Sequence, residues 1–260
     1  MSDFSLTFLG TGTSVGIPMI GCDCAVCKSS DPRDQRLRSS VWIQTPELSW
    51  VVDTGPDFRL QCLRAGIRHL DATLFTHPHM DHVTGFDELR RFTIPAEVFM
   101  PTYALPSCLA VLQRMFDYAF NGENHYRGYL KPLPKPILGP FFLGETQVTP
   151  LPVLHGKVEC IGYLFSRHQQ KLCAYIPDAK ILLPETFAAL QGVDTLIIDA
   201  LRHTEHSTHM NFAEALTVQA QIKPRRTYFT HLQCEIMHAL EDPQLPAGVQ
   251  LAYDQLELTW

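Results

Sequence analysis

The sequence has no apolar run approaching the roughly 18 residues that a membrane-spanning helix needs. Its first residues, MSDFSLTFLG, lack the basic segment followed by an apolar segment that marks a secretion signal. We therefore expect no membrane partner and a cytoplasmic location. Because no secretion signal accompanies them, the eight cysteines are expected to be reduced thiols and metal ligands, not a disulfide framework.

Positive charge is also scarce. Lys and Arg number 21 against 27 Asp and Glu, which gives a formal net charge of −6. A surface that holds long nucleic acid needs an excess of positive charge, so this balance argues against a nucleic-acid partner, although it is compatible with a local basic patch. Internal repeats, low-complexity tracts and long linkers are absent as well, and we expect a single domain spanning residues 1–260.

Short runs rich in β-branched and aromatic residues alternate with helical stretches, which predicts a layered α/β protein. The predicted strands are residues 5–10, 40–45, 49–55, 72–77, 146–153, 161–167, 171–178, 195–201 and 226–231. Helices are predicted at residues 106–120, 184–191 and 211–222. Pro106 and Pro184 suit a first helical turn, and Asn211 suits an N-cap.

Two further segments have the composition of loops. Residues 121–145 are rich in Pro and Gly and lack periodicity, which predicts an irregular excursion that acts as a lid or a contact surface. Residues 9–18, LGTGTSVGIP, can present backbone N–H groups to a phosphate or form a plain structural turn. The lysine of a P-loop is missing, so the sequence leaves both interpretations open.

The segment LFTHPHMDHVTG concentrates four potential metal ligands directly after a predicted strand. These are His77, His79, Asp81 and His82. Imidazole and carboxylate groups suit zinc, manganese or iron. Core filling does not explain them, because buried histidine and aspartate carry a desolvation cost unless they are paired.

Three more candidate ligands follow predicted strands further along the chain. They are His155 in LPVLHGK, Asp178 in AYIPDAK and His231 in YFTHLQC. Each one alone would be an ordinary polar residue at a strand end. Together with the four ligands of the first segment they make a set of seven.

The order and spacing of these seven ligands resemble the metallo-β-lactamase superfamily of binuclear hydrolases. The resemblance covers nearly the whole chain and implies a four-layer αββα sandwich with the site at the strand ends. It also implies that one metal is held by His77, His79 and His155 and the other by Asp81, His82 and His231, with Asp178 between them. Asp53 in VVDTG matches a position where a buried carboxylate orients the ligand loop, or it caps the following turn.

Cys22, Cys24 and Cys27 lie within six positions and are one ligand short of a tetrahedral metal site. Cys234 follows the predicted ligand His231 by three positions, and we expect it to complete a structural zinc site. The opening LGTGTSVGIP with this cysteine trio resembles the PhnP-like cyclic-phosphate phosphodiesterases of phosphonate breakdown, in which the fourth ligand can be a histidine. The alternative is a loop of reduced thiols. The remaining cysteines are expected to be small buried hydrophobes: Cys62, Cys108, Cys160 and Cys173.

Phosphodiester cleavage needs a proton donor for the departing alkoxide, and histidine suits that task. In DALRHTEHSTHMNF, the resemblance favours His209, which lies just before an Asn-capped helix, whereas His203 and His206 are weaker candidates for substrate contacts. The alternative for His209 is a local hydrogen bond at the helix entry. We count His209 and the metal ligand Asp81 as the predicted catalytic residues.

The sequence therefore predicts a binuclear metal-dependent phosphodiesterase. Its substrate would be a small sugar phosphate or nucleotide diester, either cyclic or linear. Two divalent ions, Mn²⁺ or Zn²⁺ or iron, are expected at the catalytic site, together with one structural Zn²⁺. The alternatives are a tRNA-maturing endonuclease, a lactonase-type hydrolase of carbon esters and a non-catalytic metal-binding protein of the same fold. A homodimer is the commonest arrangement for such a chain if it self-associates.

Overall fold

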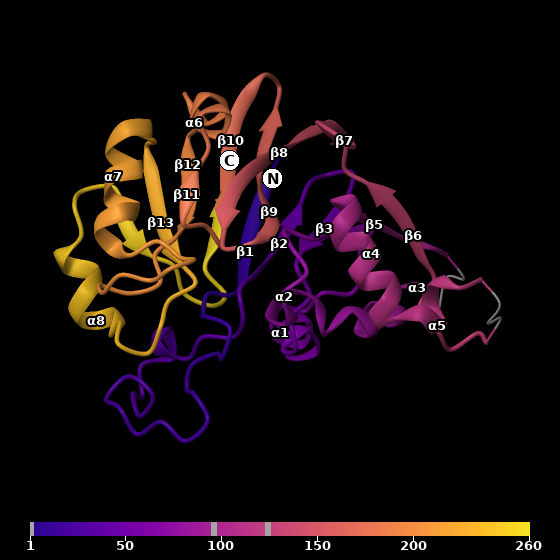
Figure 1. Cartoon of the computed structure of the whole chain (residues 1–260), viewed down its shortest axis with the longest axis horizontal. Coiled ribbons are helices and arrows are strands. Elements are labelled where there is room, and N and C mark those ends of the chain that lie inside the picture. The colour runs from indigo at the N-terminus through magenta and orange to yellow at the C-terminus, as the bar shows by residue number, and fades with distance from the viewer. Residues whose placement is uncertain (1–2, 95–97, 123–125) are drawn as a thin grey trace.

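The structure is a computed structural model that describes residues 3–94, 98–122 and 126–260. Two β-sheets lie face to face, and helices cover the outer face of each sheet (Figure 1). The predicted αββα sandwich is thus confirmed. No helix in these described ranges is long and apolar enough to cross a membrane.

The first sheet has the strand order β15-β1-β2-β3-β4-β5-β6. Strands β1 to β3 pair antiparallel, and β3 to β6 pair parallel. The bounds are β1 (Ser5–Gly10), β2 (Ser40–Gln44), β3 (Ser49–Val52), β4 (Ala72–Leu74), β5 (Met100–Ala104), β6 (Pro132–Pro136) and β15 (Glu257–Thr259).

The second sheet has the order β11-β8-β9-β10-β12-β13-β14, with β7 paired to β8. Strands β8, β9 and β10 form an antiparallel meander, and β10, β12, β13 and β14 run parallel. The bounds are β7 (Phe141–Leu143), β8 (Thr146–His155), β9 (Val158–Arg167), β10 (Gln170–Ile176), β11 (Ile181–Leu182), β12 (Thr195–Asp199), β13 (Arg226–Thr230) and β14 (Val249–Leu251).

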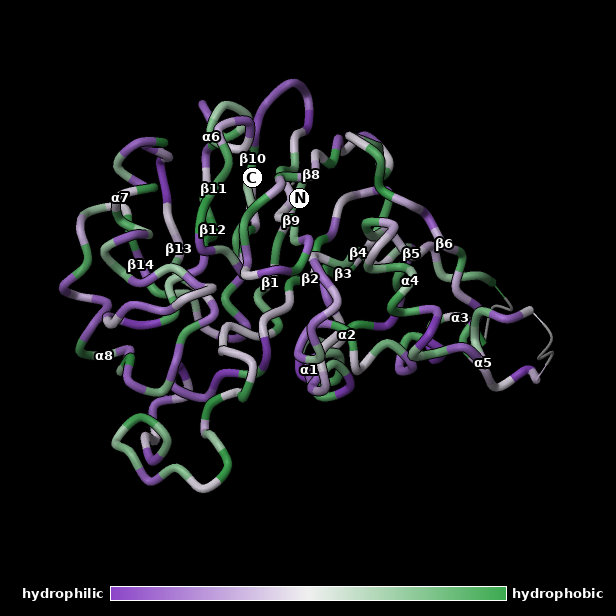
Figure 2. The backbone as a smooth tube through the Cα atoms, viewed as in Figure 1, coloured by the Kyte–Doolittle hydropathy of each residue, from purple (hydrophilic) through white to green (hydrophobic). Residues whose placement is uncertain are grey.

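The helices form the two outer layers and the connections between strands. Helices α1 (Phe58–Ala65) and α4 (Pro106–Met115) contribute to the core outside the first sheet, and α6 (Pro184–Leu190) and α7 (Phe212–Ile222) to the core outside the second. Figure 2 shows hydrophobic residues recurring along the central strands and polar residues along many connecting loops. The short helices are α2 (Met80–Val83), α3 (Arg90–Thr93), α5 (Asp117–Phe120), α8 (His238–Glu241), η1 (Pro32–Asp34), η2 (Phe86–Leu89) and η3 (Asp242–Gln244).

A third apolar cluster joins the facing sides of the two sheets. Trp50 of β3 and Phe165 of β9 are buried in it, with ring centroids 6.3 Å apart. Burying two such aromatic side chains contributes several kcal/mol each at about 25 cal/mol per Å² of apolar surface. This cluster fixes the relative position of the sheets and therefore of the strand ends that carry the candidate ligands.

Helix ends follow the sequence signals closely. Pro106 and Pro184 lie in the first turn of α4 and α6, as predicted. Asn211 caps α7: its side chain accepts a hydrogen bond from the backbone N–H of Glu214, whose side chain accepts one from the backbone N–H of Asn211. The helix predicted over residues 106–120 is interrupted at Phe116, where the backbone leaves helical geometry (φ −118°, ψ 40°), and resumes as α5.

Residues 121–145 differ from the irregular excursion that we expected. Where the structure describes them, they supply β6 at the edge of the first sheet and β7 beside β8. Proline lacks a backbone N–H and is tolerated in a sheet at an edge strand. The segment PLPKP therefore forms the edge strand β6, although its composition is typical of loops.

Candidate metal centre

The candidate ligands come from different strands whose ends meet at one side of the sandwich. His77 lies three residues after β4, His155 ends β8, Asp178 follows β10 and His231 follows β13. The structure brings the seven predicted ligands into two adjoining sets, each with ligand atoms within 4.8 Å of one another. The histidine group comprises His77, His79 and His155, and the mixed group comprises Asp81, His82, Asp178 and His231.

In the histidine group three imidazole nitrogens converge. His77 Nε2 and His155 Nε2 lie 2.9 and 3.2 Å from Nδ1 of His79. His155 donates its Nδ1–H to the carbonyl oxygen of Thr208 at 2.9 Å, which leaves its Nε2 with a free lone pair toward the group. Several lone pairs directed at one point are the arrangement that a divalent cation requires.

In the mixed group the buried His82 lies between two carboxylates. Its Nε2 is 3.2 Å from an oxygen of Asp81 and 3.2 Å from Oδ1 of Asp178. Asp178 Oδ1 is also 3.3 Å from Nδ1 of His231. His82 Nε2 and Asp178 Oδ1 are buried without a hydrogen-bond partner among the described residues, although buried polar atoms are normally paired. These unpaired atoms and the donor types fit divalent metal ions.

Burial and neighbouring charges shift the pKa values of several ligands. Burial lowers the pKa of His231 to about 3, and it lowers the pKa of His77 well below its ordinary value. Burial alone would raise the pKa of Asp178, but the imidazoles of His231 and His82 outweigh it and hold that pKa well below its usual range. Neutral imidazole and ionised carboxylate are the forms that bind metals.

Asp53 holds the ligand segment in place. Its carboxylate accepts hydrogen bonds from Nδ1 of His82 at 2.8 Å and from the backbone N–H and hydroxyl of Thr76 at 2.9 Å each. This directs Nε2 of His82 toward the mixed group. Asp53 (φ 65°) and His231 (φ 60°) both adopt the left-handed region, which non-glycine residues occupy at an energetic cost and which is common at functional sites.

Gly55, two residues after Asp53, permits a close approach to the ligand segment. A Cβ atom at this position would collide with the carbonyl oxygen of Asp81. The turn after β3 can therefore pack directly against the backbone that carries Asp81 and His82. The sequence VVDTG indicated a turn here but not this contact.

His209 lies at the same centre. Its Nδ1 is 3.9 Å from Oδ2 of Asp178. The His209 ring stacks on the ring of His231, with centroids 4.7 Å apart. Its Nδ1 also donates a hydrogen bond of 2.7 Å to Asp199. Burial alone would lower the pKa of His209, but the Asp199 carboxylate outweighs it and raises this pKa to about 9. No pattern in the sequence singles out Asp199 beyond its position at the end of β12.

His203 and His206 are not part of either ligand set. His203 Nε2 pairs with a carboxylate oxygen of Glu241 at 3.1 Å and is half exposed. His206 accepts a hydrogen bond from the backbone N–H of Thr208 at 3.3 Å, and its ring lies 5.1 Å from that of His209.

The glycine-rich segment of residues 9–18 forms a structural turn beside the centre. The backbone N–H of Gly12 donates to Leu37 O at 2.8 Å, and that of Thr13 donates to Leu232 O at 3.2 Å. Both N–H groups are therefore used within the fold and are not presented to a phosphate. The contact with Leu232 places this turn next to His231.

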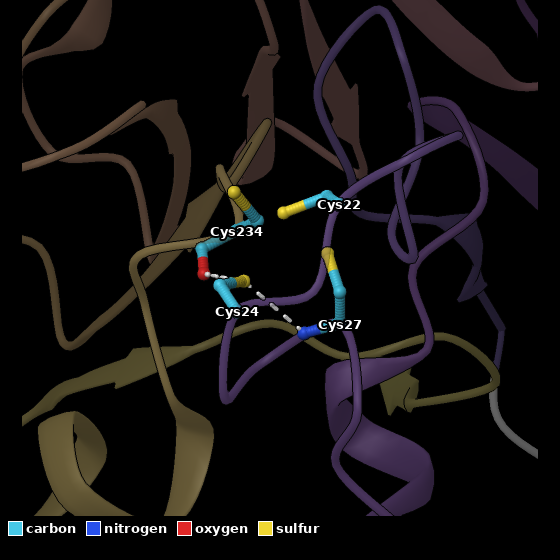
Figure 3. A group of neighbouring side chains, drawn as sticks. All are labelled: Cys22, Cys24, Cys27 and Cys234. Carbon is cyan, nitrogen blue, oxygen red and sulfur yellow. Dashed lines mark hydrogen bonds between the residues drawn. The ribbon is translucent and has the colours of Figure 1, made fainter.

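The four predicted cysteines also meet. Their sulfur atoms lie within 4.8 Å of one another, and Figure 3 shows Cys22, Cys24 and Cys27 on the N-terminal loop opposite Cys234 on the loop after β13. The backbone N–H of Cys27 donates to Cys24 Sγ at 3.4 Å, and this hydrogen bond is the main reason why the pKa of Cys24 falls to about 7. A thiolate at neutral pH is the form that binds zinc.

A buried arginine joins the same two loops independently of the cysteines. Arg36 is fully buried and donates hydrogen bonds to the carbonyl oxygens of Ile236 at 2.7 Å and Gln233 at 3.3 Å. It also pairs with Asp34 at 3.0 Å, and Asp34 accepts the backbone N–H of His238 at 2.9 Å. The loop that follows His231 is therefore held from two sides.

The fold and the converging histidine and carboxylate ligands define an αββα protein with a candidate centre for divalent metal ions. Proteins of this class use divalent metal ions such as zinc. The chain belongs to the β-lactamase superfamily, because the family's domain model matches residues 50–232.

Three known proteins show the range of this similarity. A crystal structure of a diphosphatase from the PhnP family superimposes with a TM-score of 0.91 at 38% identity and covers 99% of this chain and 98% of its own. An octanoyltransferase of Porphyromonas gingivalis is 35% identical over 96% of this chain and 50% of its own length. Ribonuclease Z of Bradyrhizobium diazoefficiens is 34% identical over 72% of this chain and 55% of its own length. The chain thus spans about half the length of the curated relatives that it matches.

Proposed function

We propose that this protein is a binuclear metal-dependent phosphodiesterase that hydrolyses a small sugar phosphate or nucleotide diester, either cyclic or linear. The observation that carries the proposal is the meeting of seven ligand side chains with His209, which is hydrogen-bonded to the buried Asp199. The similarity to a PhnP-family diphosphatase over nearly the whole length of both chains supports chemistry at phosphorus.

The histidine group would hold one ion, Mn²⁺ or Zn²⁺, and the mixed group the other. Such a pair would supply an activated water and would withdraw charge from the phosphate oxygens. Asp53 keeps His82 in the orientation that a ligand needs, and the Thr208 carbonyl does the same for His155.

His209 would act as the general acid. An alkoxide leaving group is strongly basic and departs readily only when it receives a proton as the P–O bond breaks. The bond from His209 Nδ1 to Asp199 fixes the ring, keeps the imidazole charged and leaves Nε2 to hold the transferable proton. This arrangement favours substrates with a poor leaving group, such as the sugar oxygen of a phosphodiester.

A structural zinc bound by the cysteine cluster completes the proposal. Four cysteines close a tetrahedral site and leave no open position, so this zinc would support the fold and not the chemistry. It would tie the N-terminal loop to the loop that follows His231. Metal binding there would add free energy to folding and stabilise the position of that ligand.

A second candidate is hydrolysis of a diphosphate, and the name of the PhnP-family neighbour favours it. The two activities differ in the leaving group, because a phosphate leaves without the proton that an alkoxide needs. Cleavage of a diphosphate should therefore depend much less on His209. This difference separates the two candidates.

The experiment is turnover of a ribose cyclic phosphate by the full chain loaded with Mn²⁺ or Zn²⁺. A linear phosphodiester, a diphosphate, a precursor tRNA and a lactone are assayed beside it. Metal-dependent opening of the cyclic phosphate that is lost in His209→Ala would support the proposal. Turnover of the diphosphate alone would favour the second candidate, and turnover of only the tRNA or the lactone would overturn both.

A further inference from the structure

A cavity of about 640 Å³ lies between α1 and the segment that contains η2 and α3. It belongs to the outer layer of the first sheet, where these helices pack on the strands (Figure 1). None of its lining residues is a candidate metal ligand or a member of the cysteine cluster. Its volume is within the range of roughly 300–1,000 Å³ that is usual for small-molecule sites.

The floor and one rim of this cavity are apolar. Phe58 and Ile67 are buried beneath it, and Phe92 lies partly buried at its side. Leu63 is 62% exposed at the rim. Cys62, which we expected to be a small buried hydrophobe, is only partly buried and lines the same space.

The charged groups of the cavity are almost all of one sign. Among the described residues, Arg59, Arg68, Arg90 and Arg91 line it, against a single acid, Glu88. Arg90 pairs with Asp87 at 2.9 Å, whereas the other three arginines make no ion pair or hydrogen bond with another described residue. Four arginines at one cavity stand out in a chain whose net charge is −6.

We propose that this cavity binds an amphipathic anion, namely an acyl or alkyl chain that ends in a carboxylate or a phosphate. The chain would cover Leu63, Phe92 and Ile94, which are at least partly exposed, and remove their apolar surface from water. Guanidinium groups form bidentate hydrogen bonds with carboxylate and phosphate groups, so Arg59 and Arg91 would hold the head group. A neutral lipid would leave the arginines without a partner, and a bare phosphate would leave the apolar surface of Leu63 and Phe92 in water.

The test is calorimetric titration of the metal-loaded full chain with four probes below their micelle concentrations: decanoate, decyl phosphate, decyltrimethylammonium and inorganic phosphate. We expect saturable binding, with one molecule per chain, of decanoate, of decyl phosphate or of both, and which of them binds identifies the head group. Equal binding of the decyl cation, equally tight binding of inorganic phosphate, or no binding of either decyl anion would overturn the proposal.

Variants locate the bound molecule. The double substitution Arg59→Glu with Arg91→Glu should weaken binding at least tenfold, while Arg114→Glu should leave it unchanged. Arg114 is an exposed arginine on α4 outside the cavity, so Arg114→Glu controls for a charge reversal elsewhere on the surface. Asp178→Asn, which alters the metal centre, should bind the probe as the unaltered chain does. Binding that Asp178→Asn abolishes and the double variant keeps would assign the molecule to the metal centre and contradict the proposal.

Discussion

Nδ1 of His209 and Oδ2 of Asp199 are joined by a hydrogen bond of 2.7 Å, and Asp199 is fully buried. The same oxygen accepts the backbone N–H of Ala179 at 2.9 Å, next to the ligand Asp178. Asp199 thus connects the proposed proton donor to the strand end that carries a candidate metal ligand. A carboxylate in this position both orients the imidazole and stabilises its charged form.

Replacing this carboxylate should move the pH dependence of turnover. Because Asp199 raises the pKa of His209 to about 9, Asp199→Asn should lower this pKa. A general acid must be protonated, so turnover would begin to fall at a lower pH on the alkaline side. The measurement is kcat against pH for a cyclic phosphate. An alkaline limb that does not move would show that His209 is not the acid.

The loss in His209→Ala should depend on the leaving group. For a ribose cyclic phosphate, whose leaving group is an alkoxide, kcat should fall by roughly 10²–10⁴-fold, the usual contribution of general acid catalysis. For a p-nitrophenyl phosphodiester, whose leaving group needs no proton, the loss should be much smaller. Equal losses with both substrates would indicate that His209 acts on binding or on the metals. His203→Ala is the control, because His203 pairs with Glu241 and belongs to neither ligand set.

Zinc content should separate the cysteine cluster from the catalytic pair. Cys234→Ala should lose one zinc per chain, as measured by elemental analysis, and should unfold at a lower temperature. Cys234→His should keep the zinc, because histidine is also a ligand in such sites. Cys173→Ala removes a fully buried thiol in the core and should lower stability without loss of zinc. An unchanged zinc content in Cys234→Ala would contradict the structural site.

The ion pair between Glu47 and Arg167, which lies outside the metal centre, should make the free energy of unfolding depend on pH. The Arg167 side chain donates to Glu47 at 2.6 Å and lowers the pKa of that carboxyl to about 2. Since the pKa in the unfolded chain is about 4.3, the stabilisation is present above that pH and is lost as the pH falls toward 2. Glu47→Gln should cost about 0.5–1 kcal/mol at pH 7, because the Glu47 carboxylate is partly open to solvent although Arg167 is buried.

The measurement is the free energy of unfolding in urea between pH 7 and pH 2. The difference between the unaltered chain and Glu47→Gln should shrink through the acidic range and vanish near pH 2. Glu145→Gln is the control, because Glu145 is more exposed and lies 3.5 Å from the same guanidinium. A difference that stays constant with pH would contradict the assignment.

Much of the fold was predictable because the strands carry clear β patterns. Each of the nine predicted strands is present, and polar residues at strand ends marked where the ligands meet. The edge strand β6 was missed because its prolines suit only an edge, and composition does not reveal which strand lies there. The helix α1, with its exposed leucines and arginines, was also missed because its apolar face is weak.

The candidate site was predictable as a set of residues but not as a set of contacts. Spacing indicated seven ligands and four cysteines, since residue types with metal affinity recur in only a few places. The sequence did not indicate that Asp199 supports His209, or that Arg36 joins the loops on both sides of the cysteine cluster. Each of these pairings depends on long-range packing, which no local pattern encodes.

The most direct test of a binuclear hydrolase is a metal titration. The chain is stripped of its catalytic metals while one zinc is retained, and hydrolysis of a ribose cyclic phosphate is followed as Mn²⁺ or Zn²⁺ is added back. We predict that turnover rises to its maximum only when two further ions are bound per chain, and that Asp178→Asn lacks this rise. Full turnover with one added ion, or with none, would contradict a binuclear mechanism.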